Sequence, residues 1–316
     1  MNFGETIKNE IVNKPIKDEV YKKAFLSGAI RGCGTIFLQD GEYGFELKVG
    51  EENAAMLLTD YFKEVFGYDV REIAVLQDKL NKKDKFILTF TGNFALKILA
   101  ETGIIAENNG VVYVSNDLSK HIANDESWAK AFLRGIFISS GSCSVPDNAR
   151  DKKTGYHLQI VFSHSASASM ISDLLLKYGF STKITRNREN YILYIKSAEE
   201  IKDFLAFIAV PVSVLKITEL MVNRDFVNDI NRRKNCDLGN VNRQLDATLK
   251  QTEAIKKIIT FKGMDYLKED LKTVAQARLD YPDDSITELS KRLNLSKSCI
   301  NHRFRKIIEY AKEIKG

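Results

Sequence analysis

AFLRGIFISSG, residues Ala131–Gly141, repeats the pattern of AFLSGAIRGCG, residues Ala24–Gly34. In both stretches the apolar spacing is typical of a buried helix. Each copy also sets glycines into its apolar run, namely Gly28 and Gly32 in the first and Gly135 and Gly141 in the second. Because glycine carries no side chain, we expect the two helices to pack together with their backbones in close approach.

The segments that follow the two stretches also repeat in order. After the first come YGFELKVG, the helical NAAMLLTDYFKEVFG, VREIAVLQD, a polar turn and KFILTFTG. After the second come YHLQIVFS, the helical SASMISDLLLKYGF, STKITRN, a polar turn and NYILYIKS, and a further helix closes each copy. The sequence therefore predicts an α+β fold in which an αββαββα unit is duplicated with pseudo-two-fold symmetry. The two copies occupy residues 21–115 and 120–215, after a lead-in at 1–20.

The composition is that of an ordinary globular protein, with 44% hydrophobic and 28% charged residues. The longest apolar run, Phe204–Leu215, is interrupted by Pro211 and is too short to span a bilayer. The first residues show no basic region followed by an apolar stretch, so we expect no secretory signal. The four cysteines lie far apart, and the C-x-x-H pair Cys299 and His302 has no second pair nearby. We therefore expect a cytoplasmic protein without disulfides, metal, cofactor or membrane contact.

Basic charge is concentrated in the C-terminal third of a chain whose net charge is +5. Leu289–Ile307 (LSKRLNLSKSCINHRFRKI) holds six Lys or Arg and no Asp or Glu. A dense block of unpaired positive charge indicates a polyanion partner, and the phosphates of nucleic acid are the usual one. The alternative is a helix face that contacts only water.

Residues 285–308 show the spacing of a helix-turn-helix. Ser285 and Glu288 form an S-x-x-E capping box, which predicts the start of the first helix. Asn294 suits the turn, because asparagine tolerates a left-handed backbone better than most residues. Ser296 can then cap the second helix. This order of signals is typical of helices that bind DNA.

At 100° per residue, the second of these helices has one apolar and one polar side. Ile300, Phe304 and Ile307 share the apolar side and should pack inward. On the polar side, Asn301 can pair with adenine and Arg305 with guanine. The alternative is a helical hairpin that only contacts the other domain. The predicted DNA-binding residues are Ser296, Lys297, Ser298, Asn301, His302, Arg303, Arg305 and Lys306.

The segment between the repeats and the helix-turn-helix is predicted to be helical with one break. Within Lys216–Asp280, the stretch Asn231–Asn240 (NRRKNCDLGN) carries three consecutive basic residues and Gly239. We expect this stretch to be a turn that bends freely, inside a basic helical linker at 216–245. Its basic residues either contact phosphates or face water. A helical DNA-binding domain at 246–316 then follows.

The nonapeptides LSGAIRGCG (26–34) and LRGIFISSG (133–141) resemble the LAGLIDADG motif of homing endonucleases. The resemblance implies two helices packed at a pseudo-dyad, where a carboxylate at the eighth motif position of each helix holds the metal ions that cut DNA. The eighth positions here are Cys33 and Ser140, whereas a hard cation needs carboxylate oxygens. We therefore expect no catalytic residues at these lost ligand positions. The alternative is that a nearby acid supplies the ligand: Asp40, Glu42 or Asp147.

Two further segments, NRRKNCDLGN (231–240) and LSKSCINHRFRK (295–306), extend a resemblance that covers nearly all of the chain. With the metal-less repeat before them, they identify the chain as a member of the WhiA family of bacterial transcriptional regulators. The resemblance implies a DNA-binding regulator of Gram-positive bacteria, linked to sporulation, cell division and chromosome organisation. It also implies a helix-turn-helix that is similar to the promoter-reading region of sigma factors. Gly239 departs from the alanine of the family pattern.

We expect a non-enzymatic transcriptional regulator that binds double-stranded DNA in the nucleoid. The repeat would be a second DNA surface, a ligand sensor or a contact for another transcription or division protein, and we favour the protein contact. Residues 1–215 carry almost no net charge, which weakens any DNA contact there. The alternatives are an active endonuclease and an interaction scaffold that does not bind DNA. The strand face of the repeat mixes Lys48, Lys85, Lys183, Arg186, Arg188 and Lys196 with Glu46 and Glu72.

Overall fold

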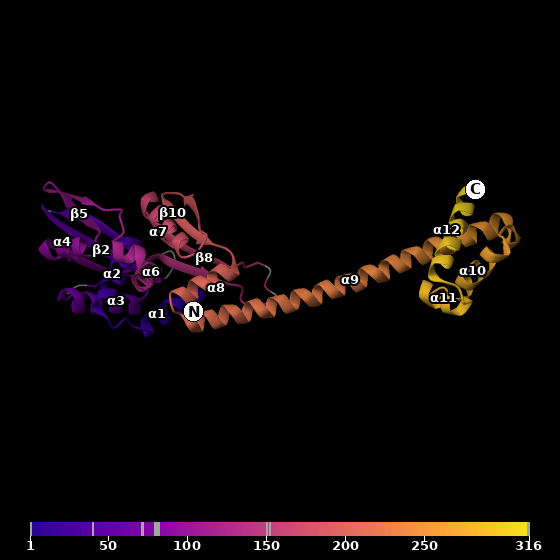
Figure 1. Ribbon diagram of the computed structural model, residues 1–316, viewed down its shortest axis with the longest axis horizontal. Coiled ribbons are helices and arrows are strands. Elements are labelled where there is room, and N and C mark those ends of the chain that lie inside the picture. Colours follow the sequence, from indigo (N-terminus) through magenta and orange to yellow (C-terminus); the bar gives the residue numbers. More distant parts are fainter. Residues whose placement is uncertain are drawn as a thin grey trace. The chain divides into compact units, whose positions relative to one another are not determined.

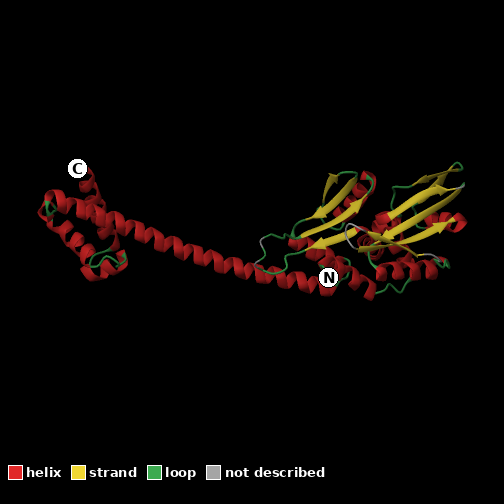
Figure 2. Ribbon diagram, turned by 180° about the vertical axis from the view of Figure 1, so that it is seen from behind, coloured by secondary structure: helices red, strands yellow, loops and turns green. Residues whose placement is uncertain are grey.

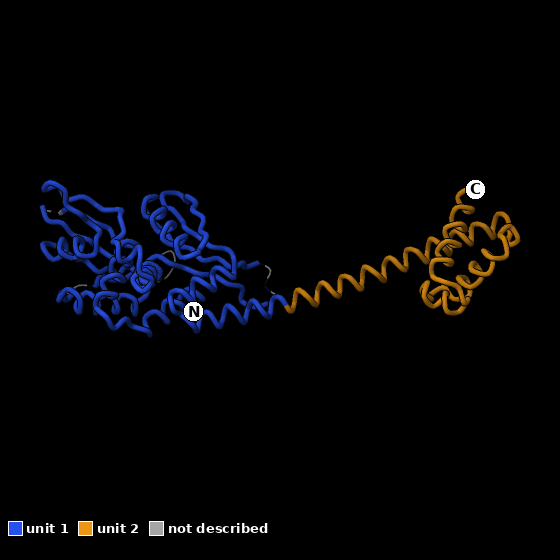
Figure 3. Tube along the Cα trace, viewed as in Figure 1, with its two compact units in different colours: residues 1–225 blue, residues 226–316 orange. Residues whose placement is uncertain are grey.

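The chain forms two compact units, residues 1–225 and residues 226–316 (Figure 3). The first unit combines helices with sheets, whereas the second is built from helices (Figure 1). Each unit has a hydrophobic core of its own. Of the 316 residues, the computed structural model describes 2–39, 41–70, 73–78, 83–149, 151 and 153–314.

The first repeat contains the predicted seven elements around a four-stranded antiparallel sheet. The strand order is β1-β2-β4-β3, so the two hairpins of the repeat lie side by side. The elements are α2 (Glu19–Cys33), β1 (Gly34–Gln39), β2 (Glu42–Val49), α3 (Glu52–Phe66), β3 (Ile73–Asp78), β4 (Lys83–Thr91) and α4 (Gly92–Glu101).

The second repeat has the same element order and the same strand order, β7-β8-β10-β9. This equivalence confirms the duplicated αββαββα fold. Its elements are α6 (Glu126–Ser140), β7 (Gly141–Ser144), β8 (His157–Phe162), α7 (Ser165–Lys177), β9 (Lys183–Asn187), β10 (Asn190–Ile195) and α8 (Ala198–Phe207).

The two repeats meet along α2 and α6, whose backbones touch at paired glycines. A Cβ atom at Gly28 would lie 2.0 Å from the carbonyl oxygen of Phe132. A Cβ atom at Gly135 would lie 1.9 Å from the carbonyl oxygen of Phe25. Any side chain at either position would therefore force the helices apart, which confirms the predicted close approach. Gly141 does not take part in this contact, because it is the first residue of β7 and its Cβ would meet Phe137 of α6.

One face of each four-stranded sheet is buried against helices, which are red beside the yellow strands in Figure 2. In β2, Phe45, Leu47 and Val49 are buried, while Glu46 and Lys48 point to the opposite face. This alternation follows from the two-residue period of a strand. The apolar halves of both sheets and the α2–α6 pair form one continuous core.

The predicted lead-in is a helix with a structural role, α1 (Phe3–Asn13). Ile7 and Ile11 of α1 are fully buried in the core of the first unit. The Glu10 carboxylate accepts hydrogen bonds from the Val212 and Ser213 amides at 2.8 and 2.9 Å. A carboxylate on free amides at a helix N-terminus is a stabilising cap. The other elements without a sequence prediction are the hairpin β5 (Ile105–Asn108) and β6 (Val111–Val114) and the short helix α5 (Lys120–Asn124).

The prediction of a turn at Asn231–Asn240 is wrong, because α9 (Pro211–Lys262) is one helix through this segment. A single glycine costs about 1 kcal/mol in a helix interior, and the segment holds no proline to break the chain of hydrogen bonds. Helix growth is also cooperative once a turn has formed, so the flanking turns carry the helix through weak positions. An ion pair between Arg233 and Asp229, 2.8 Å long and one turn apart, adds to it.

The rest of the second unit is helical, as predicted. A short 3₁₀ turn, η1 (Met264–Tyr266), follows α9. Three helices then complete the unit: α10 (Glu269–Asp280), α11 (Ile286–Leu293) and α12 (Lys297–Glu313).

Gly28→Ala should destabilise the first unit, because the added methyl group overlaps the Phe132 carbonyl unless α2 and α6 separate. We expect a loss of about 3 kcal/mol in the free energy of unfolding, the upper range for overpacking a core. The only tryptophan, Trp128, lies in α6 and contacts Tyr21 of α2 with ring centroids 6.0 Å apart. Urea unfolding followed by tryptophan fluorescence therefore reports on this unit.

Gly50→Ala is the matched control, because a Cβ at Gly50 meets no atom within 4 Å. Its midpoint should stay close to that of the unsubstituted protein. Equal losses in the two variants would mean that the helix contact does not limit the stability of this unit.

Candidate nucleic-acid interface

The inner side of α12 belongs to the core of the second unit. Ile300, Phe304 and Ile307 are buried there, and Leu289 of α11 packs into the same cluster. The prediction that the three α12 residues point inward is confirmed. The polar side of α12 is consequently left facing solvent.

Helix α11 begins at the predicted capping box. The Glu288 amide donates to the Ser285 hydroxyl at 3.2 Å, and the Ser285 amide donates to the Glu288 carboxylate at 2.6 Å. The second of these hydrogen bonds favours the ionised carboxylate and lowers the pKa of Glu288. The helix therefore has a fixed starting point, as the sequence predicts.

The turn between α11 and α12 is held by hydrogen bonds across the corner. The Ser290 hydroxyl donates to the Leu295 carbonyl at 2.5 Å, and the Leu295 amide donates to the Ser290 carbonyl at 3.1 Å. Asn294 has φ 50°, in the left-handed region. Ser296 accepts from the Cys299 amide at 3.1 Å and starts α12. The predicted left-handed turn and the predicted cap are both confirmed.

A buried arginine that the sequence gives no reason to single out fixes the approach to α11. Arg278 of α10 is 1% exposed, and its Nε donates to Gln251 Oε1 at 3.1 Å. One of its terminal nitrogens, Nη1, donates to the carbonyls of Pro282 and Asp284 at 3.2 and 2.5 Å. Its guanidinium also lies over the Phe304 ring of α12. Burial lowers the pKa of Arg278, and its carbonyl and amide acceptors compensate the buried charge.

The predicted DNA-binding residues fall into two groups. Arg303 is half-buried with its Nε 3.8 Å from Asp270 Oδ2, and the Ser296 hydroxyl is engaged as a cap. These two are tied into the fold of the unit. Arg292, part of the basic block, is similarly occupied, because it stacks 3.6 Å from the Tyr281 ring centroid. The structure leaves the others exposed together on the polar side of α12: Lys297, Ser298, Asn301, His302, Arg305 and Lys306.

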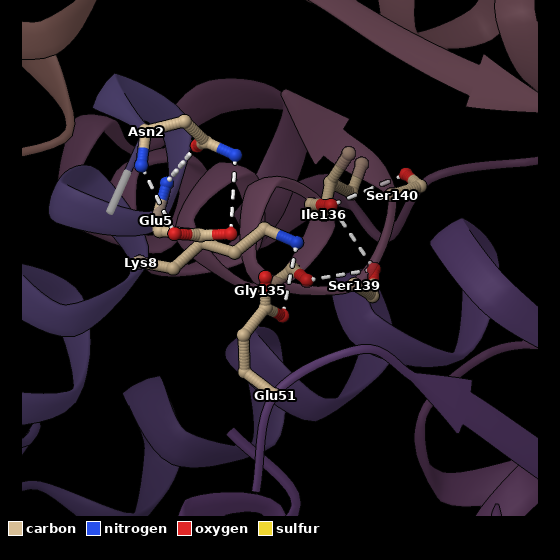
Figure 4. A network of polar contacts seen from close by, with 8 residues as sticks. All are labelled: Asn2, Glu5, Lys8, Glu51, Gly135, Ile136, Ser139 and Ser140. Atoms are coloured by element: carbon tan, nitrogen blue, oxygen red, sulfur yellow. Dashed lines mark hydrogen bonds and ion pairs between the residues drawn. The ribbon is translucent and has the colours of Figure 1, made fainter. Parts of the chain in front are cut away.

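The last residues of α2 and α6 are the lost ligand positions, Cys33 and Ser140. The Ser140 hydroxyl donates to the Ile136 carbonyl at 3.2 Å, inside its own helix (Figure 4). The Cys33 thiol likewise donates to the Ala29 carbonyl at 3.6 Å. Both groups are therefore used as neutral donors to the helices that carry them.

A lysine approaches this end of the helix pair. Lys8 of α1 is largely buried, and its Nζ lies 3.2 Å from Glu51 Oε2. In Figure 4 its ammonium end points toward Glu51. Its charge also acts on the Cys33 thiol. A fixed positive charge here opposes a metal cation and already neutralises the nearby carboxylate.

The acids considered as substitute ligands do not gather at this place. Glu42 starts β2 at the end of the hairpin opposite to Gly34, and Asp147 follows β7 in a loop. Asp40 and Glu72 lie outside the described residues. Among the residues that the structure describes, no three His, Cys, Asp or Glu side chains come together as a metal site. Cys299 and His302 likewise have no third side chain of these types beside them among the described residues.

The outer strand face carries mixed charges. Lys48 lies 2.8 Å from Glu46 on the same strand, so this lysine is paired. On the second sheet, β9 is exposed along its length, and Arg186 Nε donates to the Arg188 carbonyl at 3.2 Å. This face is accessible, but its charge is partly compensated.

Family comparison agrees with this architecture along the chain. The models described as WhiA N-terminal LAGLIDADG-like domain, WhiA LAGLIDADG-like domain and WhiA C-terminal HTH domain match residues 19–105, 129–227 and 230–311. A protein named "Probable cell division protein WhiA" from Clostridium acetobutylicum is 30% identical over 100% of this chain and 99% of its own. The chain belongs to the WhiA family.

Other WhiA proteins support the same assignment over the full length. The protein of that name from Clostridium botulinum is 31% identical over 100% of this chain and 99% of its own. The crystal structure of full-length DUF199/WhiA from Thermatoga maritima matches with a TM-score of 0.58 and 26% identity, covering 100% of both chains. This WhiA-family chain has two LAGLIDADG-like repeats whose paired helices end in a thiol and hydroxyls, with the Lys8 ammonium of α1 acting on the thiol.

The thiols of Cys33 and Cys143 should resist alkylation at pH 8. Burial raises the pKa of Cys33 to about 11 and that of Cys143 to about 12. Only about one Cys33 thiol in a thousand is then ionised at pH 8, and the thiolate is the reactive form. Iodoacetamide treatment and peptide mass spectrometry should show modification of Cys236, which is exposed on α9, and little of the other two.

Alkylation of Cys33 should rise about tenfold per pH unit until its pKa is reached. Equal labelling of Cys33 and Cys236 at pH 8 would instead reveal a thiolate at the end of α2, which could bind a soft metal ion.

Proposed function

We propose that this protein is a transcriptional regulator that reads double-stranded DNA with the exposed side of α12 and does not cleave it. The observation that carries the proposal is the cluster of polar and basic side chains on the N-terminal half of a capped helix. In helix-turn-helix proteins this part of the second helix enters the major groove. The matched WhiA C-terminal HTH domain supports the same reading of residues 230–311.

The chemistry of the exposed side suits both phosphates and base edges. Lys297 and Lys306 supply positive charge for the backbone, the usual source of affinity. Asn301 offers an amide that can pair with adenine, and Arg305 a guanidinium that can pair with guanine. The phosphate contacts position the helix, and the base contacts specify the sequence.

Reading a base edge also requires that the helix be held still. The hydrogen bonds around Ser290 and Asn294 fix the turn, and Arg278 ties α10 to the start of α11. Arg278 also lies over the buried Phe304 ring, on the side of α12 that faces the core. A rigid support of this kind limits the entropy lost when the helix binds.

The LAGLIDADG-like repeats act without catalysis in this proposal. Two-metal cleavage needs carboxylates at the ends of α2 and α6, and Cys33, Ser140 and Lys8 offer none. We propose that the repeats contact another transcription or division protein. Relatives that cover the full chain are named probable cell division proteins, so we propose that the regulated genes act in cell division. The family resemblance adds sporulation and chromosome organisation as related processes.

We also propose that the protein works in the cytoplasm, bound to the nucleoid. This follows from the duplex DNA partner. Among the described residues, none of the helices has the length and apolar character needed to cross a membrane.

Asn301→Ala/Arg305→Ala should lose sequence preference for duplex DNA. Each bidentate base contact contributes about 1–3 kcal/mol of discrimination, so preference should fall at least tenfold. Selection from random duplexes with the unsubstituted protein would first give the preferred sequence. Binding to that sequence and to a scrambled duplex, titrated over several salt concentrations, then measures the loss.

Asn242→Ala/Arg243→Ala is the matched control, because it removes the same two residue types from an exposed part of α9. It should keep the preference. If the α12 variant also keeps it, the repeats hold the DNA instead. If the full-length protein shows no salt-dependent affinity, it is an interaction scaffold.

Supercoiled plasmid should stay intact when it is incubated with the full-length protein and Mg²⁺ or Mn²⁺. The reason is that the ends of α2 and α6 supply no carboxylate pair for the two metal ions. Gel electrophoresis over a time course checks this. Nicking above the buffer control that disappears in Glu51→Gln would establish an active endonuclease; nicking that survives Cys33→Ala/Ser140→Ala would locate its site elsewhere.

A further inference from the structure

Among the residues that the structure describes, the middle of α9 is an exposed segment. Its residues 230–247 are exposed except for Gly239, which is half-exposed. In proteins most helical stability comes from packing one apolar side against a neighbour. A helix segment without such packing is therefore expected to find a partner for any apolar side that it carries.

This segment does carry an apolar side. Phe226, Ile230, Val241 and Leu245 are between 48% and 67% exposed. With Lys234 and Asp237 between them, the six residues fall within an arc of about 100° around the helix. A surface groove of about 430 Å³ lies at the centre, lined by Ile230, Arg233, Lys234, Asp237, Leu238 and Val241. We call the six residues of the arc the α9 stripe.

The spacing of residues in the α9 stripe is the same in both directions along the helix. Its residues follow one another at steps of 4, 4, 3, 4 and 4 along the sequence, so its centre lies between Asn235 and Cys236. Turning a second copy of the helix end over end brings apolar positions onto apolar positions. Phe226 then faces the partner's Leu245, and Ile230 faces the partner's Val241.

We propose that a second copy of this chain packs antiparallel along the α9 stripe and forms a two-fold dimer. The two charged residues decide the direction. In the antiparallel pairing, Lys234 faces the partner's Asp237, and the same contact occurs twice. In a parallel pairing, Lys234 would face the partner's Lys234 and Asp237 the partner's Asp237, and like charges at such close range repel.

Charged residues at the centre also fix the register. A polar residue within an apolar helix seam specifies pairing at some loss of affinity. A shift by one helical turn would place Lys234 or Asp237 against an apolar side chain. The steps of 4, 4 and 3 add to 11 residues, a repeat that keeps the stripe nearly straight along the helix, so both apolar ends can engage together.

Charge exchange in the full-length protein tests the pairing. The unsubstituted protein should show a reversible monomer–dimer equilibrium in sedimentation over a concentration series. Lys234→Glu creates two like-charge contacts in each dimer and should raise the dissociation constant about tenfold or more. Asp237→Lys should do the same, and the double variant Lys234→Glu/Asp237→Lys should restore the original constant to within about threefold.

Arg232→Glu is the matched control, because it makes the same charge change on the opposite side of the helix. It should leave the dissociation constant within about threefold of the original. A protein that stays monomeric throughout the series would overturn the proposal. So would a double variant as weak as the single ones.

Disulfide formation tests the direction, in a Cys236→Ser background. Ile230→Cys/Val241→Cys should give a covalent dimer on mild oxidation, because each new cysteine faces the other kind across the pair. Ile230→Cys alone should not give one. In the antiparallel pair residue 230 faces the partner's residue 241, so the two new cysteines are offset by 11 residues, about 16 Å along the helix, which is beyond disulfide reach. A covalent dimer with the single variant would indicate parallel helices and overturn the proposal.

Discussion

The contact between α2 and α6 at Gly28 and Gly135 is the constraint on which the first unit depends. Two carbonyl oxygens lie within about 2 Å of where Cβ atoms would be, so the helices touch backbone to backbone at these two positions. This proximity lets both sheets share one core, because the helix pair is buried between the two repeats. It also sets the end of α2 beside the end of α6, where a Cβ at Gly32 would meet the Ser139 hydroxyl at 2.1 Å.

The same geometry bears on our proposal that the LAGLIDADG-like repeats act without nuclease chemistry. Because the two helix ends are close, the side chains of their last residues lie near one another. Carboxylates at these positions would repel one another without metal ions. Here the ends carry Cys33, Ser139 and Ser140, whose hydrogen atoms are donated to carbonyls within their own helices. Lys8 brings a positive charge to the same place and pairs with Glu51. In our proposal the positive charge of Lys8 stands where a metal ion would otherwise be needed, and DNA contact is left to α12.

Local signals in the sequence are sufficient for the parts of the fold that depend on neighbouring residues. The glycine pattern predicts the helix pair, and Ser285, Asn294 and Ser296 predict the helix-turn-helix, because caps and turns involve residues a few positions apart. The predicted turn at Asn231–Asn240 failed because weak helix formers do not stop a helix that is already nucleated on both sides.

Contacts between distant segments could not be predicted in this way. Glu10 caps α9 across about 200 residues of sequence, and Lys8 of α1 pairs with Glu51, the residue before α3. From the sequence alone, Arg278 would be assigned to a solvent-facing position. Its burial depends on the carbonyls of Pro282 and Asp284, which come together only when the segment between α10 and α11 has folded. Each of these three residues carries a charge whose role is fixed by tertiary structure.

Hydrogen exchange of the full-length protein, with and without its preferred duplex, tests the division of labour between the two units most directly. Our account predicts new protection in α11 and the N-terminal half of α12, with little change at the ends of α2 and α6 or in the sheets. Protection confined to β1–β4 and β7–β10, with α12 unchanged, would contradict it and make the LAGLIDADG-like repeats the DNA-binding surface.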